Sequence, residues 1–403
     1  MALVWCDGFD WCTSQDDPGR SSGPDDWTRA GSGTRSLQAG RYGGQCIRIV
    51  SSSIQGYHYR TSAAGHAEAY AGTSSAMFNA QLVTAIDAGT NANFFPFFAF
   101  TATASGVIVL SYNPSTMEFR ATHTYGTLNG SGPGTTIVTS TPLGADISAA
   151  WHHFEVHLFE DDVSGTLKLL LDKVEVMSFT GDTEYGTING AAIRGGFVSS
   201  GERCTHEFDD FSWTYGNASP LGIESRVMTL LPTSDDAADW TASAGGNVFD
   251  LVDVVDADTT YIEESNDTDR ASFGFEDLSY DPAEILGVNV LAVGKRSAGA
   301  GTASAAVFIK EGVSTYHEIS QNLGLTTTYG PSMNSVWAEN PATTSPWTSA
   351  DISGIIAGVR NDIAAGATTD RVTFIGLNVC ADIEVAPAPP SGGGGNSLLM
   401  ITM

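Results

Sequence analysis

Residues 151–159 read Trp-His-His-Phe-Glu-Val-His-Leu-Phe, and Asp-Asp-Val-Ser-Gly at 161–165 separates them from a second apolar run at 166–171. Even-numbered positions of the first run carry His, Phe, Val and Leu, and odd-numbered ones carry Trp, His, Glu, His and Phe. Because successive side chains of a strand point to opposite faces, this alternation predicts a strand. The polar turn then predicts an antiparallel hairpin, and Asp172-Lys173 predicts the next one.

The same pattern of strand, polar tip and strand extends in both directions from this hairpin. We expect strands at Gln45–Val50, Phe94–Phe100, Gly106–Tyr112, Met117–Thr122, Glu224–Leu231, Ile285–Val293, Ala305–Lys310 and Arg371–Val379. Phe94–Phe100 is nearly all apolar and is expected to be a central strand, although Pro96 favours an edge or a bulge. Ser349–Arg360 is the one segment with helical spacing of its apolar residues, and its Ser/Asp start suits a helix N-terminus.

The sequence therefore predicts an all-β fold of two tandem β-sandwich (jelly-roll) domains with an extended C-terminal tail. The first domain is expected at 1–215, a linker at 216–223 and the second domain, with its short helix, at 224–385. Residues 386–403 form a Pro/Gly-rich tail. The tail ends in an apolar run with Leu398, Leu399, Met400 and Ile401, which is either a frayed end or a strand added to a neighbouring subunit.

Composition narrows the classes of function. The chain has 403 residues, of which 46 are acidic and 18 basic, for a net charge of −28. With no run of Lys or Arg, no nucleic-acid partner is expected, and contact with anionic membranes is disfavoured. Met1–Val4 has no basic start or long apolar stretch, so neither a signal peptide nor a membrane-inserted segment is predicted.

Five scattered cysteines, at 6, 12, 46, 204 and 380, have no zinc-site spacing and form no disulfide framework. Buried free thiols are expected, with Cys6 and Cys12 as one alternative pair in an oxidising medium.

Several segments together carry a family resemblance. They are Asp7–Asp10 (DGFD), Gly40–Ile49 (GRYGGQCIRI), Trp151–Val156 (WHHFEV), Phe208–Trp213 (FDDFSW) and Trp337–Thr343 (WAENPAT). In this order they resemble a family of two-domain bacteriophage virion proteins whose N-terminal domain is a laminin-G or concanavalin A-like lectin sandwich. The resemblance runs to about residue 378. It implies a scaffold protein of the tail, collar, fibre or capsid decoration, made in the host bacterial cytoplasm and located on the virion.

The acidic residues offer two candidate roles, catalysis and calcium binding. Glycoside hydrolases need two carboxylates a few ångströms apart, usually on one strand face, whereas Glu155 and Asp172 are isolated in the sequence. Calcium suits loop carboxylates better. If the first and last strands of the first domain pair, Asp7 and Asp10 would meet Asp209 and Asp210, so these four are the candidate calcium ligands. The alternative is that they cap solvated turns.

Aromatic residues offer a candidate glycan site. Tyr57, Tyr59, Trp240, Trp337 and Trp347 lie in loop-like surroundings, where a flat ring could stack on a sugar. Packing in a core or a subunit interface is the preferred interpretation. Likewise, His153 and His157 share a strand face but have no further ligand placed by sequence to complete a metal site.

The sequence thus predicts a non-enzymatic structural component of a phage particle, assembled as a homo-oligomer with other virion proteins. The first alternative is a tail fibre or adhesin that recognises host surface glycans. The second is a polysaccharide depolymerase.

Overall fold

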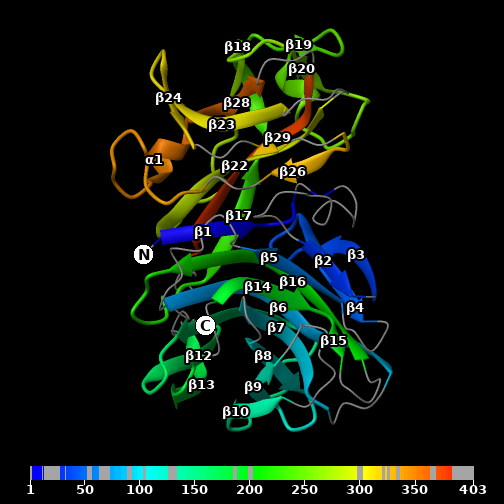
Figure 1. Ribbon diagram of the computed structural model, residues 1–403, viewed down its shortest axis with the longest axis vertical. Coiled ribbons are helices and arrows are strands. Elements are labelled where there is room, and N and C mark those ends of the chain that lie inside the picture. Colours follow the sequence, from blue (N-terminus) through cyan, green and yellow to red (C-terminus); the bar gives the residue numbers. More distant parts are fainter. Residues whose placement is uncertain are drawn as a thin grey trace, which may run out of the picture.

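The computed structural model describes residues 2–10, 12, 28–31, 33–51, 57–62, 73–88, 93–102, 106–125, 134–184, 188–197, 203–296, 303–319, 323–324, 327–332, 336–363 and 369–383. The described chain is almost entirely antiparallel β-structure in four sheets, which form two sandwiches, one above the other in Figure 1. This confirms the all-β prediction. None of the described helices is long and apolar enough to cross a membrane.

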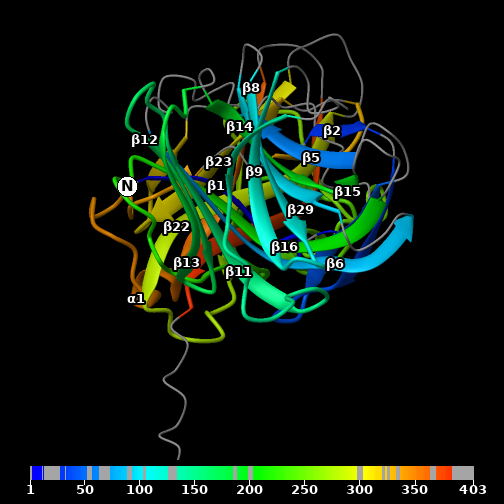
Figure 2. The ribbon, with the colours of Figure 1, turned by 90° about the horizontal axis from the view of Figure 1, so that it is seen from below.

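The first sandwich is formed by two sheets from the N-terminal half. Its first sheet, sheet A, contains β13 (Val174–Gly181), β12 (Gly165–Leu171), β11 (Trp151–Phe159), β6 (Thr73–Ala88), β16 (Arg203–Tyr215), β4 (Gln45–Ser51) and β3 (Gly33–Ala39) in that order, with β1 (Ala2–Asp7) and β15 (Gly196–Phe197) also paired to β16. Its second sheet, sheet B, contains β10 (Thr135–Thr139), β9 (Glu118–Tyr125), β8 (Gly106–Asn113), β7 (Phe95–Ala102), β14 (Ile188–Arg194), β5 (Tyr57–Ser62) and β2 (Thr28–Gly31). Figure 2 shows this half from below, where the paired strands β6 and β16 curve across the molecule.

The second sandwich follows the same plan. Its sheet D contains β19 (Thr241–Ala242), β20 (Ile262–Glu264), β29 (Asp370–Asp382), β22 (Glu284–Arg296) and β26 (Gly330–Ser332), with β17 (Ser225–Leu230) on β29 and β27 (Val336–Trp337) on β22. Its sheet E contains β18 (Pro232–Ala238), β21 (Arg270–Phe275), β28 (Ile356–Ile363), β23 (Ala303–Glu311) and β24 (Thr315–Glu318), with β25 (Leu323–Gly324) on β23. A short 3-10 helix covers Phe249–Leu251.

The helix expected at Ser349–Arg360 is correct only in its first turn. Helix α1 covers Ser349–Ile352 and is capped by Thr348, whose hydroxyl accepts the Asp351 amide. It ends before Gly354, whose positive φ of 82° breaks the helical path. From Ile356 the chain is strand β28. Ile352 and Ile355 are buried before this strand begins, and Ala357 and Val359 of β28 reach the same core at strand spacing.

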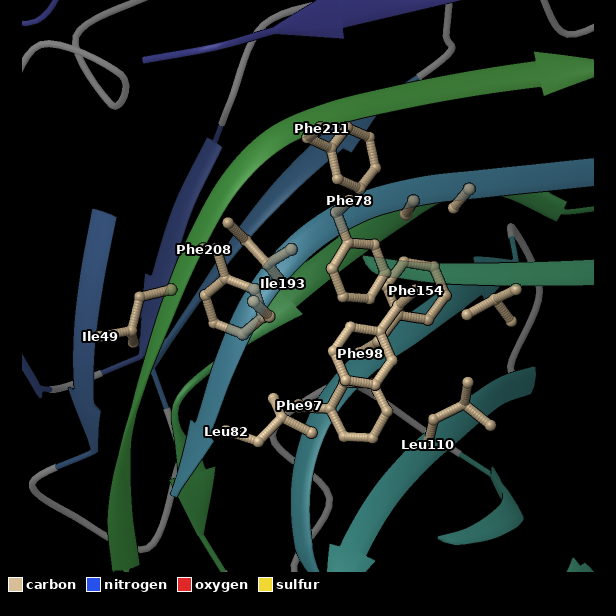
Figure 3. Packing of buried hydrophobic residues seen from close by; sticks show 14 of the residues in the cluster. Ile49, Phe78, Leu82, Phe97, Phe98, Leu110, Phe154, Ile193, Phe208 and Phe211 are labelled. Carbon is tan, nitrogen blue, oxygen red and sulfur yellow. The ribbon is translucent and has the colours of Figure 1, made fainter. Parts of the chain in front are cut away.

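Phenylalanine rings fill the core of the first sandwich. Phe78 of β6 pairs with Phe154 of β11 across sheet A, and their ring centroids are 5.5 Å apart. Phe98 of β7 in sheet B stacks on Phe78 at 5.3 Å, so the two sheets meet ring to ring (Figure 3). Such aromatic pairs contribute about 0.5–1.5 kcal/mol each beyond the apolar area they bury. The predicted central strand β7 is confirmed, and Pro96 lies at a register shift in it.

Candidate functional site

The two sandwiches meet along a contact that we call the seam. On one side are β1, residues 40–44 and the outer face of sheet A at β6, β11 and β16. On the other side are residues 216–228 and sheet D at β22 and β29. β1 belongs to sheet A by its pairing with β16, and it lies between the two halves in Figure 1. The buried polar and charged side chains of the seam include Asn79, Glu155, Asp209, Asp210 and Glu224.

Two consecutive aspartates on β16 link three separate segments. Asp210 has a positive φ of 51°, and the register of β16 on β6 shifts between Asp209 and Ser212. This bulge places both carboxylates in the buried seam. Asp209 accepts the Arg41 amide at 2.8 Å. Asp210 accepts the Val227 amide at 2.9 Å and the Asn79 side-chain amide at 2.8 Å. β16 thereby binds the 40–44 turn, β6 and the first strand of the second sandwich.

An ion pair lies beside these aspartates. Glu224 is 6% exposed, and its Oε1 lies 2.7 Å from Nη2 of Arg41 and 2.5 Å from the hydroxyl of Tyr42, which donates to it. The Arg226 guanidinium lies 5.0 Å from the centre of the Tyr42 ring and 5.5 Å from that of Tyr280. Burial and the Glu224 hydrogen bond raise the pKa of Tyr42 far above its usual value, so this phenol stays protonated as a donor.

The predicted linker is held against sheet A. Both carboxylate oxygens of Glu155 accept linker amides, from Leu221 at 2.6 Å and from Gly222 at 2.8 Å. Nε2 of His157 lies 3.0 Å from the Asn217 carbonyl. Burial lowers the pKa of His157, so its neutral ring donates to this carbonyl. Residues 216–223 are therefore a docked segment of the seam, and Glu155 and His157 have structural partners.

His153 also has a structural place in the seam. Its Nδ1 lies 3.2 Å from the Asn79 side-chain oxygen, and burial lowers its pKa to about 3. The ring is neutral at neutral pH. Its Nε2 is buried without a hydrogen-bond partner in the part of the chain that the structure describes.

The predicted calcium ligands are partly brought together. β1 pairs with β16, as the prediction required. Burial and mutual repulsion raise the pKa of Asp209 well above its usual range. Burial is also the main cause that raises the pKa of Asp10 to about 6 and that of Asp210 to about 7. Repulsion from Asp10 raises the pKa of Asp210 further. The carboxylate of Asp7 accepts the Phe9 amide two residues on.

Whether these carboxylates fit a cation depends on where their oxygens point. Asp209 and Asp210 direct both of their oxygens at N–H donors, and Asp10 directs one at the Gln45 amide. Within the described ranges no group of three or more His, Cys, Asp or Glu side chains is arranged to hold a metal. The geometry therefore gives no ready set of ligands, and calcium remains a prediction. We assign no function to a metal here.

The predicted glycan-binding tryptophans need correction. Trp240, Trp337 and Trp347 are 3%, 8% and 5% exposed and belong to the core of the second sandwich. The Trp240 indole donates to the Asp269 carbonyl, and that of Trp347 to the Trp337 carbonyl. Their rings are packed in the core and present no open face to a sugar. The prediction failed because a turn-rich sequence around an aromatic residue does not reveal what packs on it. Packing, the preferred interpretation, holds for these three.

For the other predicted site residues, the structure describes either the backbone alone or nothing. Tyr57 and Tyr59 are on β5, where Tyr59 pairs with Ile193, but their side chains are not among the described ones. Leu398, Leu399, Met400 and Ile401 also lie outside the described residues. Cys6 and Cys12 are separate buried thiols in different apolar clusters.

Two further acids, Asp172 and Glu207, have structural partners. Asp172 has a positive φ of 47° in the β12–β13 turn, accepts the His153 amide and lies 2.6 Å from Nδ1 of His152. Glu207 pairs with Arg48 of β4. Each carboxylate fixes a strand or a turn.

Sequence reasoning missed Arg41, Asn79 and Glu224, which complete the seam. One signal was available in the glycines of the 40–44 turn. A Cβ at Gly40 would overlap Asp209, and one at Gly44 would overlap Asp10, so both positions must be glycine for the turn to approach the aspartates. Nothing in the sequence places Asn79 or Glu224 opposite this turn.

No protein-family model and no curated protein matches the sequence. Solved structures give similarities over about half of the chain. "Cellulose induced protein, Cip1" is 17% identical with a TM-score of 0.33, over 49% of this chain and 95% of that one. Domain 4 of AbnA, a GH43 extracellular arabinanase from Geobacillus stearothermophilus, solved with arabinotriose, is 14% identical with a TM-score of 0.31, over 53% and 93%. A protein of unknown function with a galectin-like fold from Bacillus subtilis is 11% identical with a TM-score of 0.32, over 53% and 96%. At these scores the likenesses carry no argument about function, and the β-sandwich assignment rests on the strand pairing itself.

Proposed function

We propose that this protein is a non-enzymatic structural component of a bacteriophage particle, where its copies assemble as a homo-oligomer with other virion proteins. The observation that carries the proposal is the seam, where buried carboxylates bind backbone amides across two sandwiches and the segment between them. A scaffold subunit must hold its domains in one orientation under load. Buried, hydrogen-bonded charges suit this need because they tolerate little change of geometry.

The carboxylates themselves support the non-enzymatic part of the proposal. A glycosidase needs one protonated acid and one carboxylate facing a bound sugar. In this chain Glu155, Asp209 and Asp210 face amides of the seam. Their raised pKa values follow from burial in a domain contact. The phage assignment itself is supported by the order of the family-like segments.

The direct test is to purify particles from cells that carry this gene and to identify their proteins by mass spectrometry. Gold-labelled antibodies against the purified chain then locate it by electron microscopy. We expect the chain in stoichiometric amount and label on one part of the particle. Particles that lack the chain would contradict the proposal.

A glycan array on the purified protein separates the scaffold from the adhesin alternative. A scaffold gives no signal above background on host polysaccharides. Specific binding would favour the adhesin, and released reducing ends would favour a depolymerase.

A further inference from the structure

Beside the polar part of the seam lies a small apolar cluster that contains two cysteines. Its buried members are Leu3, Cys6, Met77, Val227, Leu286 and Cys380. Cys6 belongs to β1 of the first sandwich and Cys380 to β29 of the second. Both side chains are 0% exposed. The cluster therefore places one thiol from each sandwich in a single dry contact.

The backbone on both sides shows how closely β1 approaches sheet D. Cys380 pairs with Val227 on one side and with Gly287 on the other. A Cβ at Gly287 would meet the Leu3 side chain at 2.9 Å, and one at Gly8 would overlap the Val227 carbonyl. Leu3 and Gly8 lie on either side of Cys6 along the chain, just as Val227 and Gly287 lie on either side of Cys380 across sheet D. Cys6 must therefore lie over Cys380.

A register shift explains why Cys6 faces the second sandwich. The pairing of β1 with β16 shifts between Leu3 and Trp5. This irregularity places Leu3 and Cys6 on the same face, although they are three positions apart in the sequence. Interaction with the neighbouring Cys380 thiol, together with burial, raises the pKa of Cys6 well above the usual value.

The other three cysteines lie in different surroundings. Cys12 and Cys204 belong to the apolar cluster of the first sandwich, and Cys204 lies against His206. The Cys46 thiol donates to the Ala39 carbonyl at 3.5 Å. The partner of Cys6 is therefore Cys380, a residue 374 positions away (380 − 6), rather than the nearby Cys12.

We propose that Cys6 and Cys380 form a disulfide that links the two sandwiches when the protein meets a low-molecular-weight disulfide as oxidant. A thiolate of the pair attacks one sulfur of the oxidant, which gives a mixed disulfide and releases one small thiol. The second cysteine thiolate then attacks the protein sulfur of that mixed disulfide and releases the second small thiol. Two protein thiols lose two protons and two electrons, and the small disulfide is reduced to two thiols.

The link would change the seam from a non-covalent contact into a covalent one. In a reducing cytoplasm the two thiols remain free, and an oxidising medium outside the cell favours the bond. A cross-link between residues this distant in sequence constrains the unfolded chain strongly. Since both sulfurs are buried and the pKa of the Cys6 thiol is raised, the reaction is slow and its product is protected from reduction. The inference does not depend on the virion assignment.

The test incubates the native full-length protein with oxidised glutathione at mildly alkaline pH, blocks free thiols after denaturation, and maps peptides without reduction. We expect the intact mass to fall by two hydrogens and one linked peptide pair to join Cys6 to Cys380. The melting temperature should rise by several degrees and return on reduction. A link from Cys6 to Cys12, or five blocked thiols after prolonged oxidation, would overturn the proposal.

Three variants sharpen the test. Cys6→Ala and Cys380→Ala should each lose both the link and the rise in melting temperature on oxidation. Cys12→Ala, which removes an equally buried thiol near Cys6 in sequence, should retain both. If Cys380→Ala fails to fold, the peptide map of the unmodified protein still decides the question. An oxidation-dependent rise that persists in Cys6→Ala would overturn the proposal.

Discussion

The core of the first sandwich and the seam are both buried, yet they are stabilised in different ways. The core is built of stacked rings such as Phe78, Phe98 and Phe154, which are apolar throughout and can repack locally. The seam is built of carboxylates such as Glu155 and Asp210, each directed at particular backbone amides. The difference teaches that apolar area holds each sandwich together, whereas directional hydrogen bonds fix how the sandwiches are joined.

The largest expected effect is in the core. Phe78→Ala removes a fully buried ring that stacks on three others, so the free energy of unfolding should fall by about 3–5 kcal/mol. Urea denaturation followed by tryptophan fluorescence measures it. Val163→Ala, at a 75% exposed turn position, serves as the control and should change stability by less than about 0.5 kcal/mol. Similar losses for the two variants would contradict the assigned core.

In the seam, Glu155→Gln replaces one carboxylate oxygen with an NH₂ group that cannot accept a linker amide. We expect a loss of about 1–3 kcal/mol, because a buried amide loses its partner. Calorimetry should show the two sandwiches unfolding less cooperatively than in the parent protein. Glu175→Gln is the matched control: Glu175 is exposed and pairs with Lys168 on the surface, so its effect should be below about 1 kcal/mol. If the two variants behave alike, Glu155 does not hold the seam.

Asp370 tests the opposite case, a buried carboxylate with neither oxygen hydrogen-bonded among the described residues. Burial raises the pKa of Asp370 from its ordinary value of 3.8 to about 7. Between these two pH values the folded protein keeps a proton that the unfolded chain has released. Asp370 therefore stabilises the fold fully at low pH, and this contribution is lost as pH rises from about 4 to about 7. Asp370→Asn should be more stable than the parent at pH 8 by about 1–2 kcal/mol, and the gain should shrink toward pH 4. Parallel stability–pH curves for the two proteins would contradict the raised pKa.

The smallest expected effect concerns the predicted cation. If calcium binds at the predicted ligands Asp7, Asp10, Asp209 and Asp210, a tenfold excess over the dissociation constant adds about 1.4 kcal/mol of stability, which a chelator removes. Thermal unfolding with and without calcium measures this effect. Asp10→Asn should lose the response, whereas Asp162→Asn at an exposed turn should keep it. If calcium does not change the melting temperature of the parent protein, the only role of these aspartates is to bind backbone and side-chain amides.

The sequence predicted the core better than the seam, for a physical reason. Burial on one face of a strand imposes a period of two, which is visible in 151–159 and in the strand pairs around it. The seam depends on residues brought together only by the packing of two domains, such as Val227 with Asp210. The pairing of the first and last strands did predict that Asp10 would approach Asp209. The tryptophans of the second half were wrongly offered as a glycan site, because turn-forming residues next to them in the sequence do not show whether their rings are buried.

The seam's rigidity is tested most directly by amide hydrogen exchange across residues 216–227, measured by mass spectrometry on the native protein. The hydrogen bonds to Glu155 and Asp210 predict that the amides of Leu221, Gly222 and Val227 exchange about as slowly as those of β11. In Glu155→Gln, exchange at 221 and 222 should accelerate while β11 stays protected. Exchange of this segment at the rate of an unstructured peptide in the parent protein would contradict a fixed seam.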